Sequence, residues 1–148
     1  MDVEGLIAAV KAALLPRAEV RAALIFGSQV TGRARQDSDI DIAVLLDAPP
    51  LPSERKEQLR TLLEALGSSL RMDRVDLVLL NEAPSKLAFQ VLKHGRVVFA
   101  RDPIELHRFR VRTYSRHADY QPIERLFREA TKRRVLTRGG HASRGGHG

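Results

Sequence analysis

The segment DIDIAVLL, residues 39–46, limits more than any other feature what this chain can fold into. Two acids alternate with isoleucine at its start, and five apolar residues then follow without a break. An alternation of period two indicates a β-strand, and an unbroken apolar run indicates a strand buried on both faces. We therefore predict that residues 39–46 form one strand of a partly buried sheet.

Similar patterns along the chain predict further strands with helices between them. Apolar residues recur every three or four positions in each expected helix, and a short apolar run marks each expected strand. The expected helices cover residues 3–15, 53–67 and 85–95, and the further strands cover residues 20–26, 74–80 and 96–100. With a short helix after residue 27, the predicted order is helix, strand, short helix, strand, helix, strand, helix, strand.

Serine and glycine mark the expected ends of two of these helices. Serine caps a helix N-terminus with its hydroxyl, and glycine is the usual residue just past a helix C-terminus. We expect Ser53 to cap the middle helix and Gly67 to end it. We likewise expect Ser85 to cap the last of these helices and Gly95 to stop it.

Chain length and composition predict a single domain. A chain of 148 residues has room for one compact domain with a core of its own. We expect residues 1–100 to form the core unit and residues 101–136 to add a basic helical extension to the same domain, with a break at Pro122. Residues 137–148 contain no apolar side chain larger than alanine, so we expect a disordered tail there.

The net charge of +7 is concentrated in the last third of the sequence. Residues 101–148 carry 12 lysines and arginines against five acids, whereas the first 100 residues are neutral. A basic segment of this kind can serve nucleic acid, ATP phosphates or an acidic partner surface, or it can be a solvated helix face. Its few aromatic residues give little support to base stacking, so we expect no direct nucleic-acid binding.

Composition also predicts the cellular compartment. The chain has no cysteine, so it has neither a disulfide framework nor thiolate metal ligands. No segment is long and apolar enough to span a bilayer, and the N-terminus lacks the pattern of a signal peptide. We therefore expect a cytoplasmic protein with no membrane contact.

A phosphate-binding turn is predicted where strand 20–26 ends. Gly27 and Ser28 follow this strand directly, and a strand-to-helix turn points backbone N–H groups outward. Glycine lets the backbone approach a ligand closely, and the Ser28 hydroxyl can donate a hydrogen bond to a phosphate oxygen. Gly32 allows a tight path back, and Arg33 and Arg35 are candidates to offset triphosphate charge.

Three aspartates are candidates to bind a divalent metal. Asp39 and Asp41 are two positions apart at the start of strand 39–46, so their side chains share a face and repel each other. Asp76 lies among apolar residues of the next strand, where an acid is unexpected unless it reaches a site. Hard carboxylate oxygens of this kind suit Mg²⁺, which fills its other positions with water and nucleotide phosphates. We predict that Asp39, Asp41 and Asp76 are both the metal ligands and the catalytic residues.

These motifs resemble the signature of the DNA polymerase β-type nucleotidyltransferase superfamily, in its minimal nucleotidyltransferase (MNT) branch. The resemblance rests on Gly27-Ser28, Asp39-x-Asp41 and Asp76, and covers roughly residues 1–120. It implies an α/β (α+β) minimal nucleotidyltransferase fold, in which helices flank a central mixed four-stranded sheet and a helical extension follows at the C-terminus. It further implies that the aspartates hold two Mg²⁺ ions, that the turn binds the phosphates of ATP, and that Asp76 assists deprotonation of the attacking hydroxyl.

The same resemblance suggests the acceptor of the nucleotide. Stand-alone MNT proteins are similar to antitoxins that adenylylate a tyrosine of a HEPN-family toxin, an RNase, and this is the function that we expect. Two alternatives remain: a transferase that modifies a small molecule such as an aminoglycoside, and an antitoxin that acts by binding alone. The complete set of carboxylates argues against the second alternative.

A second motif is excluded by its spacing. Arg112, His117 and Tyr120 resemble the HEPN nuclease motif, but two residues separate His117 from Tyr120 where that motif has one. The chain is therefore not expected to be the nuclease. On a helix His117 and Tyr120 share a face, and we expect them to pack against the domain.

Overall fold

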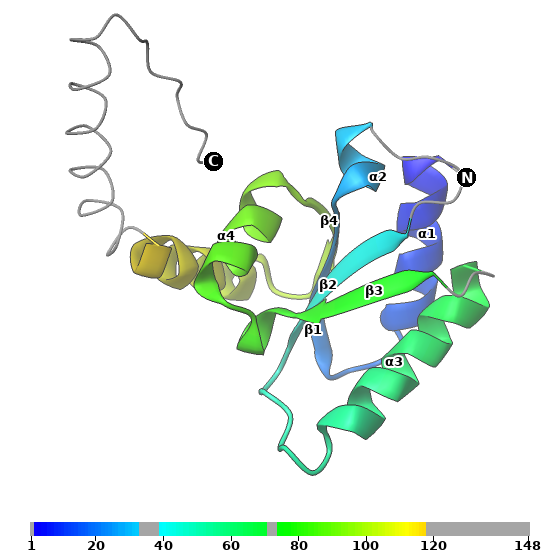
Figure 1. Ribbon diagram of the computed structural model, residues 1–148, viewed down its shortest axis with the longest axis horizontal. Coiled ribbons are helices and arrows are strands. Elements are labelled where there is room, and N and C mark those ends of the chain that lie inside the picture. The colour runs from blue at the N-terminus through cyan, green and yellow to red at the C-terminus, as the bar shows by residue number, and fades with distance from the viewer. Residues whose placement is uncertain (1, 33–38, 71–73, 118–148) are drawn as a thin grey trace, which may run out of the picture.

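The computed structural model describes residues 2–32, 39–70 and 74–117. A further helix begins at residue 103 and is described to residue 117. The order of helices and strands is the predicted one (Figure 1). In chain order the elements are α1 (Val3–Leu14), β1 (Val20–Phe26), α2 (Ser28–Thr31), β2 (Ile40–Leu46), α3 (Arg55–Leu70), β3 (Val75–Leu79), the 3₁₀-helix η1 (Leu80–Glu82), α4 (Ser85–His94) and β4 (Arg96–Ala100).

The four strands form one mixed sheet in the order β3-β2-β1-β4. β1 pairs antiparallel with both β2 and β4, and β2 pairs parallel with β3. A parallel pair needs a crossover connection, and α3 supplies it between the end of β2 and the start of β3. The predicted mixed four-stranded sheet with flanking helices is confirmed.

Helices cover both faces of this sheet, as Figure 1 shows, with α1 and α3 on one face and α4 and the 103–117 helix on the other. Alternate residues of β2 serve the two layers. Ile40, Ile42 and Val44 join the cluster with α1 and α3, whereas Ala43 and Leu45 join the cluster with α4. This double burial explains why the second half of β2 is apolar throughout.

Two of the predicted helix ends are wrong. α3 begins at Arg55, two residues after Ser53, and it continues through Gly67 to Leu70. Leu70 is 3% exposed, and the Ser69 hydroxyl donates a 2.6 Å hydrogen bond to the Ala9 carbonyl of α1. Packing of this last turn on α1 therefore outweighs the weak helix propensity of Gly67.

The ends of α4 are predicted more closely. Pro84 is the residue that caps α4, and Ser85, the expected cap, is the first helical residue. Gly95 ends the helix as predicted, and its N–H donates to the Val91 carbonyl at 2.7 Å.

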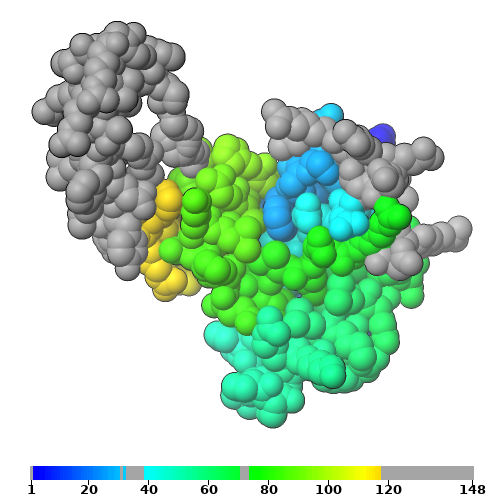
Figure 2. All heavy atoms as spheres, viewed as in Figure 1, coloured from blue at the N-terminus to red at the C-terminus, as the bar shows by residue number. Residues whose placement is uncertain are grey.

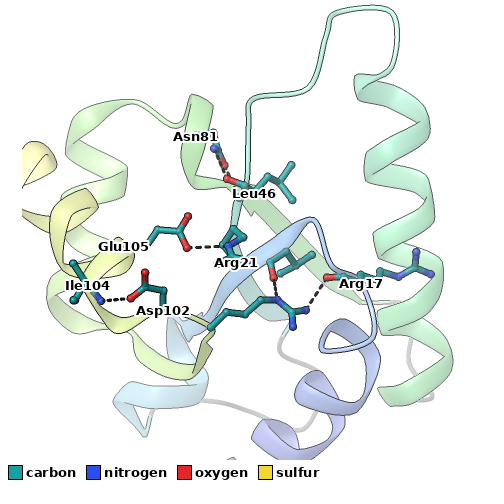
Figure 3. A network of polar contacts seen from close by, with 9 residues as sticks. Arg17, Arg21, Leu46, Asn81, Asp102, Ile104 and Glu105 are labelled. Atoms are coloured by element: carbon teal, nitrogen blue, oxygen red, sulfur yellow. Dashed lines mark hydrogen bonds and ion pairs between the residues drawn. The ribbon is translucent and has the colours of Figure 1, made fainter.

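Polar contacts attach the 103–117 helix to the start of β1 (Figure 3). Asp102 caps this helix by accepting a 3.0 Å hydrogen bond from the Ile104 N–H, and Glu105 pairs with Arg21 of β1 at 2.9 Å. Arg101 donates to the carbonyls of Leu15 at the end of α1, Arg17 in the turn that follows, and Val20, the first residue of β1. At the far end of the helix, the His117 ring stacks on Phe89 of α4 with centroids 4.0 Å apart, so the expected packing of His117 is confirmed.

Several expectations fall outside the described residues. These are Tyr120, the break at Pro122, the rest of the 101–136 extension and the 137–148 tail. Within the described ranges, no helix has the length and hydropathy needed to cross a membrane.

Neighbouring leucines of α3 offer a test of this packing. Leu62 is fully buried in the cluster shared with α1, whereas Leu63 is 36% exposed. Leu62→Ala should lower the free energy of unfolding by about 2–5 kcal/mol, because it removes buried methyl groups and leaves a cavity. Leu63→Ala should change it by about 1 kcal/mol or less. Urea denaturation measures both values, and equal losses would contradict the assignment of the buried face of α3.

Candidate active site

The turn between β1 and α2 is built around Gly27. Its φ of 77° and ψ of −151° are a combination that is essentially restricted to glycine. A Cβ atom at this position would lie 2.2 Å from Oδ2 of Asp41. Gly27 is therefore required twice, once for its backbone conformation and once for the space that the Asp41 carboxylate occupies.

Strand pairing brings Asp41 next to Asp76. The parallel register of β2 and β3 places the two residues opposite each other. Both point to the face of the sheet that α4 covers further along, because Ala43 and Val78, two positions on, pack in that layer. Gly27, Asp41 and Asp76 thus meet at one edge of one face.

The structure places Asp76 beside Asp41, as predicted, but burial in its strand is not the reason. Its apolar neighbours suggested a buried strand, but β3 lies at the edge of the sheet and the Asp76 side chain is exposed. The pairing with β2 brings this carboxylate to the site.

Negative charge accumulates around Asp41. Burial raises the pKa of the Asp41 carboxyl, and the charges of Asp76 and Asp39 raise it further. The protonated Asp41 carboxyl can also donate a hydrogen bond to Asp76, which raises this pKa as well. Asp39 lies just before β2, two residues from Asp41, and is exposed to solvent. A cation bound here would offset the repulsion among the three carboxylates.

The donor set fits Mg²⁺ in its chemistry. Carboxylate oxygens are the hard ligands that this ion takes, and it needs few of them from the protein. Among residues 2–32, 39–70 and 74–117, no three carboxylate or imidazole groups converge closely enough to surround one ion. Asp39 and Asp76 are exposed, so their side chains can turn toward a cation beside Asp41. Metal ligation by these three residues stays a prediction.

The phosphate-binding residues are placed in part. Ser28 is the first residue of α2, directly after Gly27, and Gly32 ends this short helix with a left-handed φ of 78° that gives the predicted tight path back. Arg33 and Arg35 lie outside the described residues. Nucleotide binding by Gly27, Ser28 and these two arginines stays a prediction.

Sequence reasoning missed one feature of the site. Gly27 was singled out for its approach to a ligand, yet in the structure it also makes room for the Asp41 carboxylate. Antiparallel pairing of β1 with β2 sets Phe26 opposite Asp41, which brings the turn beside this carboxylate. Local sequence carries no signal for that pairing. Figure 2 shows the end of β1 with α2 in blue, the start of β2 in cyan and the start of β3 in green, side by side at the surface.

A comparison with protein families shows the family to which this chain belongs. The model of the polymerase beta nucleotidyltransferase family matches residues 9–104. The chain belongs to this nucleotidyltransferase family. The matched range contains all seven candidate metal-binding and nucleotide-binding residues: Gly27, Ser28, Arg33, Arg35, Asp39, Asp41 and Asp76. Most of the 103–117 helix lies beyond this range.

The individual proteins that this chain resembles have more specific descriptions than the family as a whole. The chain is 40% identical over 93 residues to the protein adenylyltransferase MntA of Thermococcus cleftensis, a match that covers 62% of this chain and 88% of MntA. A crystal structure of a toxin–antitoxin with AMP-PNP contains a chain that is 27% identical, with a TM-score of 0.64 and coverage of 88% and 98%. A structure of a tri-AMPylated Shewanella oneidensis HEPN toxin in complex with MNT antitoxin gives 26% identity, a TM-score of 0.61 and coverage of 86% and 97%.

Two glycines of the turn form a matched pair for mutation. Gly27 and Gly32 both have a positive φ, but a Cβ at Gly32 meets nothing within 4 Å. Gly32→Ala should cost about 1–2 kcal/mol of stability for the left-handed backbone alone. Gly27→Ala should cost more, about 3 kcal/mol, because its conformation is restricted to glycine and the new methyl group displaces Asp41. Thermal denaturation and pyrophosphate release from ATP measure both effects, and equal losses in the two variants would contradict the role of Gly27.

Asp41→Asn should raise the melting temperature of the metal-free chain. The raised pKa means that the folded state holds the Asp41 proton more tightly than the unfolded state does, so the ionised carboxylate costs stability above that pKa. Asparagine removes this charge. Asp47→Asn, at the exposed far end of β2, is the control and should leave the melting temperature unchanged. Calorimetry in EDTA at neutral pH checks the difference, and a lower melting temperature for Asp41→Asn would refute the repulsion.

Proposed function

We propose that this chain is a protein adenylyltransferase that transfers AMP from ATP to a tyrosine hydroxyl of a cognate HEPN toxin and thereby neutralises it. The observation that carries the proposal is the meeting of Asp41, Asp76 and the Gly27 turn at one sheet edge, within a nucleotidyltransferase domain. The similarity to MntA and to the MNT antitoxin bound to an AMPylated HEPN toxin supports the choice of acceptor. A cytoplasmic reaction is part of this proposal, because a toxin that is an RNase acts on cellular RNA.

The chemistry is an in-line displacement at the α-phosphorus of ATP. The tyrosine oxygen forms a bond to this phosphorus, the bond to the bridging oxygen breaks, and pyrophosphate leaves. Asp39, Asp41 and Asp76 would hold two Mg²⁺ ions, which when bound stabilise the attacking and the leaving oxygen. The Gly27–Ser28 turn binds the phosphates with its backbone N–H groups and the Ser28 hydroxyl, and Arg33 and Arg35 offset their charge.

Exposure of Asp76 suits an acceptor that belongs to another protein. A tyrosine on a partner surface cannot enter a deep pocket without unfolding its surroundings. Asp76 lies on an edge strand in contact with solvent, so a hydroxyl that approaches from outside can reach its carboxylate. Asp76 accepts the phenolic proton as the oxygen attacks, which is the role of a general base within hydrogen-bond reach of its substrate.

Replacement of two of these carboxylates tests the proposal. Asp39→Asn with Asp41→Asn should abolish AMP transfer while the fold remains intact, because the variant loses metal ligands and also loses charge repulsion. Intact-mass spectrometry of the purified cognate toxin, incubated with the chain, ATP and MgCl₂, should show AMP additions with the wild type and none with the variant. A double variant of two exposed acids, Glu54→Gln with Glu57→Gln, removes the same charge and should retain activity.

The same experiment separates the alternative functions. Transfer by the double aspartate variant at the wild-type rate would refute the carboxylate assignment. If the wild type releases pyrophosphate only when an aminoglycoside is present and leaves the toxin unmodified, the acceptor is a small molecule. If the toxin is inhibited without any change in mass, the chain acts by binding alone.

A further inference from the structure

A second hollow lies at the opposite end of β2 from the carboxylates. It has a volume of about 330 Å³ and lies between the end of β2, the start of α4 and the 103–117 helix. We call it the distal pocket and define it by Asp47, Ser85, Phe109, Arg112, Thr113 and Arg116. Asp47 follows Asp41 by six positions along the chain, a distance of about 20 Å at roughly 3.3 Å per residue. The distal pocket is therefore separate from the site of chemistry.

Two arginines give the distal pocket a positive wall. Arg112 and Arg116 are one helical turn apart and line the pocket together. Within residues 2–32, 39–70 and 74–117 neither guanidinium forms an ion pair, and the Cζ of Arg112 lies 5.7 Å from the centroid of the Phe109 ring. Both side chains are exposed, so each can turn to a ligand without losing a carboxylate partner.

The start of α4 adds donors on the opposite wall. Pro84 caps this ten-residue helix and offers no side-chain hydrogen bond to its first turn. The Ser85 hydroxyl also lines the pocket. The N–H groups of a helix start carry partial positive charge and favour an anion.

Thr113 is the observation that points to a ligand. Its side chain is buried, with 3% exposure, and it lines the pocket. In the described part of the chain the Thr113 hydroxyl has no hydrogen-bond partner. Every side-chain oxygen or nitrogen there that is fully enclosed does have a hydrogen-bond partner. The hydroxyl must therefore reach accessible space, and the space it lines is the distal pocket. Because the hydroxyl opens onto this space, it can donate a hydrogen bond to an acceptor atom bound in the pocket.

We propose that the distal pocket docks a carboxylate carried by the partner protein. This inference rests on the proposed function, which supplies a protein as the acceptor. Arg112, Arg116, Ser85 and Thr113 together offer the donors that a carboxylate accepts, and a guanidinium can bind it with two parallel hydrogen bonds. The Phe109 ring provides an apolar wall for the stem of an acidic side chain.

The acids at the pocket favour a single carboxylate over a phosphate. Asp47 and Glu105 also line it, and Glu105 is already paired with Arg21 of β1. These acids repel a doubly charged phosphate more strongly than a singly charged carboxylate. Two unpaired arginines and one unpaired aspartate, Asp47, leave the pocket with a net charge of +1, which matches one negative charge on the ligand.

A docking site 20 Å from the chemistry should act on partner affinity alone. Contacts that are equally strong in the bound substrate and in the transition state lower KM without raising kcat. Arg112→Ser with Arg116→Ser should therefore raise the KM for the cognate toxin about tenfold or more, because it removes the charged partners of a docked carboxylate. The kcat at saturating toxin and the KM for ATP should stay at their wild-type values.

Matched variants distinguish the pocket from general surface charge. Arg108→Ser with Lys56→Ser removes two exposed positive charges that do not line the pocket, and its KM should stay within about twofold of the wild type. Thr113→Val should leave the melting temperature unchanged or raise it, since it deletes an unpartnered hydroxyl, and yet it should raise the KM for toxin.

Several outcomes would overturn the docking proposal. These are an unchanged KM in the Arg112 and Arg116 variant, an equal rise in the charge-matched control, and a melting temperature lowered by several degrees, which would mean that the arginines hold this chain's own residues. Displacement of the toxin by inorganic phosphate but not by N-acetylglutamate would assign the pocket to phosphate.

Calorimetry can measure how tightly the toxin binds to the Asp39→Asn, Asp41→Asn variant. This measurement separates docking from chemistry. If this binding depends on Arg112 and Arg116 while the wild type transfers no AMP, docking stands and the proposed function falls. If AMP is transferred and binding ignores both arginines, the proposed function stands and docking falls.

Discussion

The parallel register of β2 with β3 is the constraint on which the rest of this structure depends. It sets Asp41 opposite Asp76, and it obliges α3 to carry the chain back across one face of the sheet. α3 then packs with α1 over the alternate apolar residues of β2. A shift of this register by one residue would turn Asp76 to the opposite face and separate the two carboxylates.

The site is an arrangement that folding by itself does not favour. Asp41 and Asp76 lie opposite each other with Asp39 two residues away, and burial together with the charges of the other two acids raises the pKa of Asp41. Gly27 adopts a conformation restricted to glycine, and its lack of a Cβ leaves room for the Asp41 carboxylate. Departures from local preference that are concentrated at one place are typical of functional sites, because the surrounding core must hold them. Here that core consists of the two apolar clusters that pack on the two faces of β2.

β2 also connects the two ends of the molecule. Its start presents the carboxylates, and its end forms one wall of the distal pocket. The hydrogen bonds between the Asn81 side chain and the Leu46 backbone hold that end, and Arg21 and Arg101 attach the start of the 103–117 helix beside it. Chemistry and docking can therefore be served by opposite ends of one rigid strand.

The sequence by itself determined the order of the elements and the family signature, and it predicted a common face for Asp39 and Asp41. Each of these follows from local periodicity or from residues that are close along the chain. It also predicted that Asp76 belongs with them, although by an argument from burial that the exposed edge strand does not support.

The tertiary structure alone decided the pairing of Asp41 with Asp76, the space that Gly27 keeps for Asp41, and the continuation of α3 through Gly67 to bury Leu70. It alone also distinguished Arg112 and Arg116, which line the distal pocket, from Arg108, which does not. The physical reason is common to all of these: strand register, burial and side-chain proximity depend on contacts between distant residues, and such contacts leave no periodic trace in the sequence.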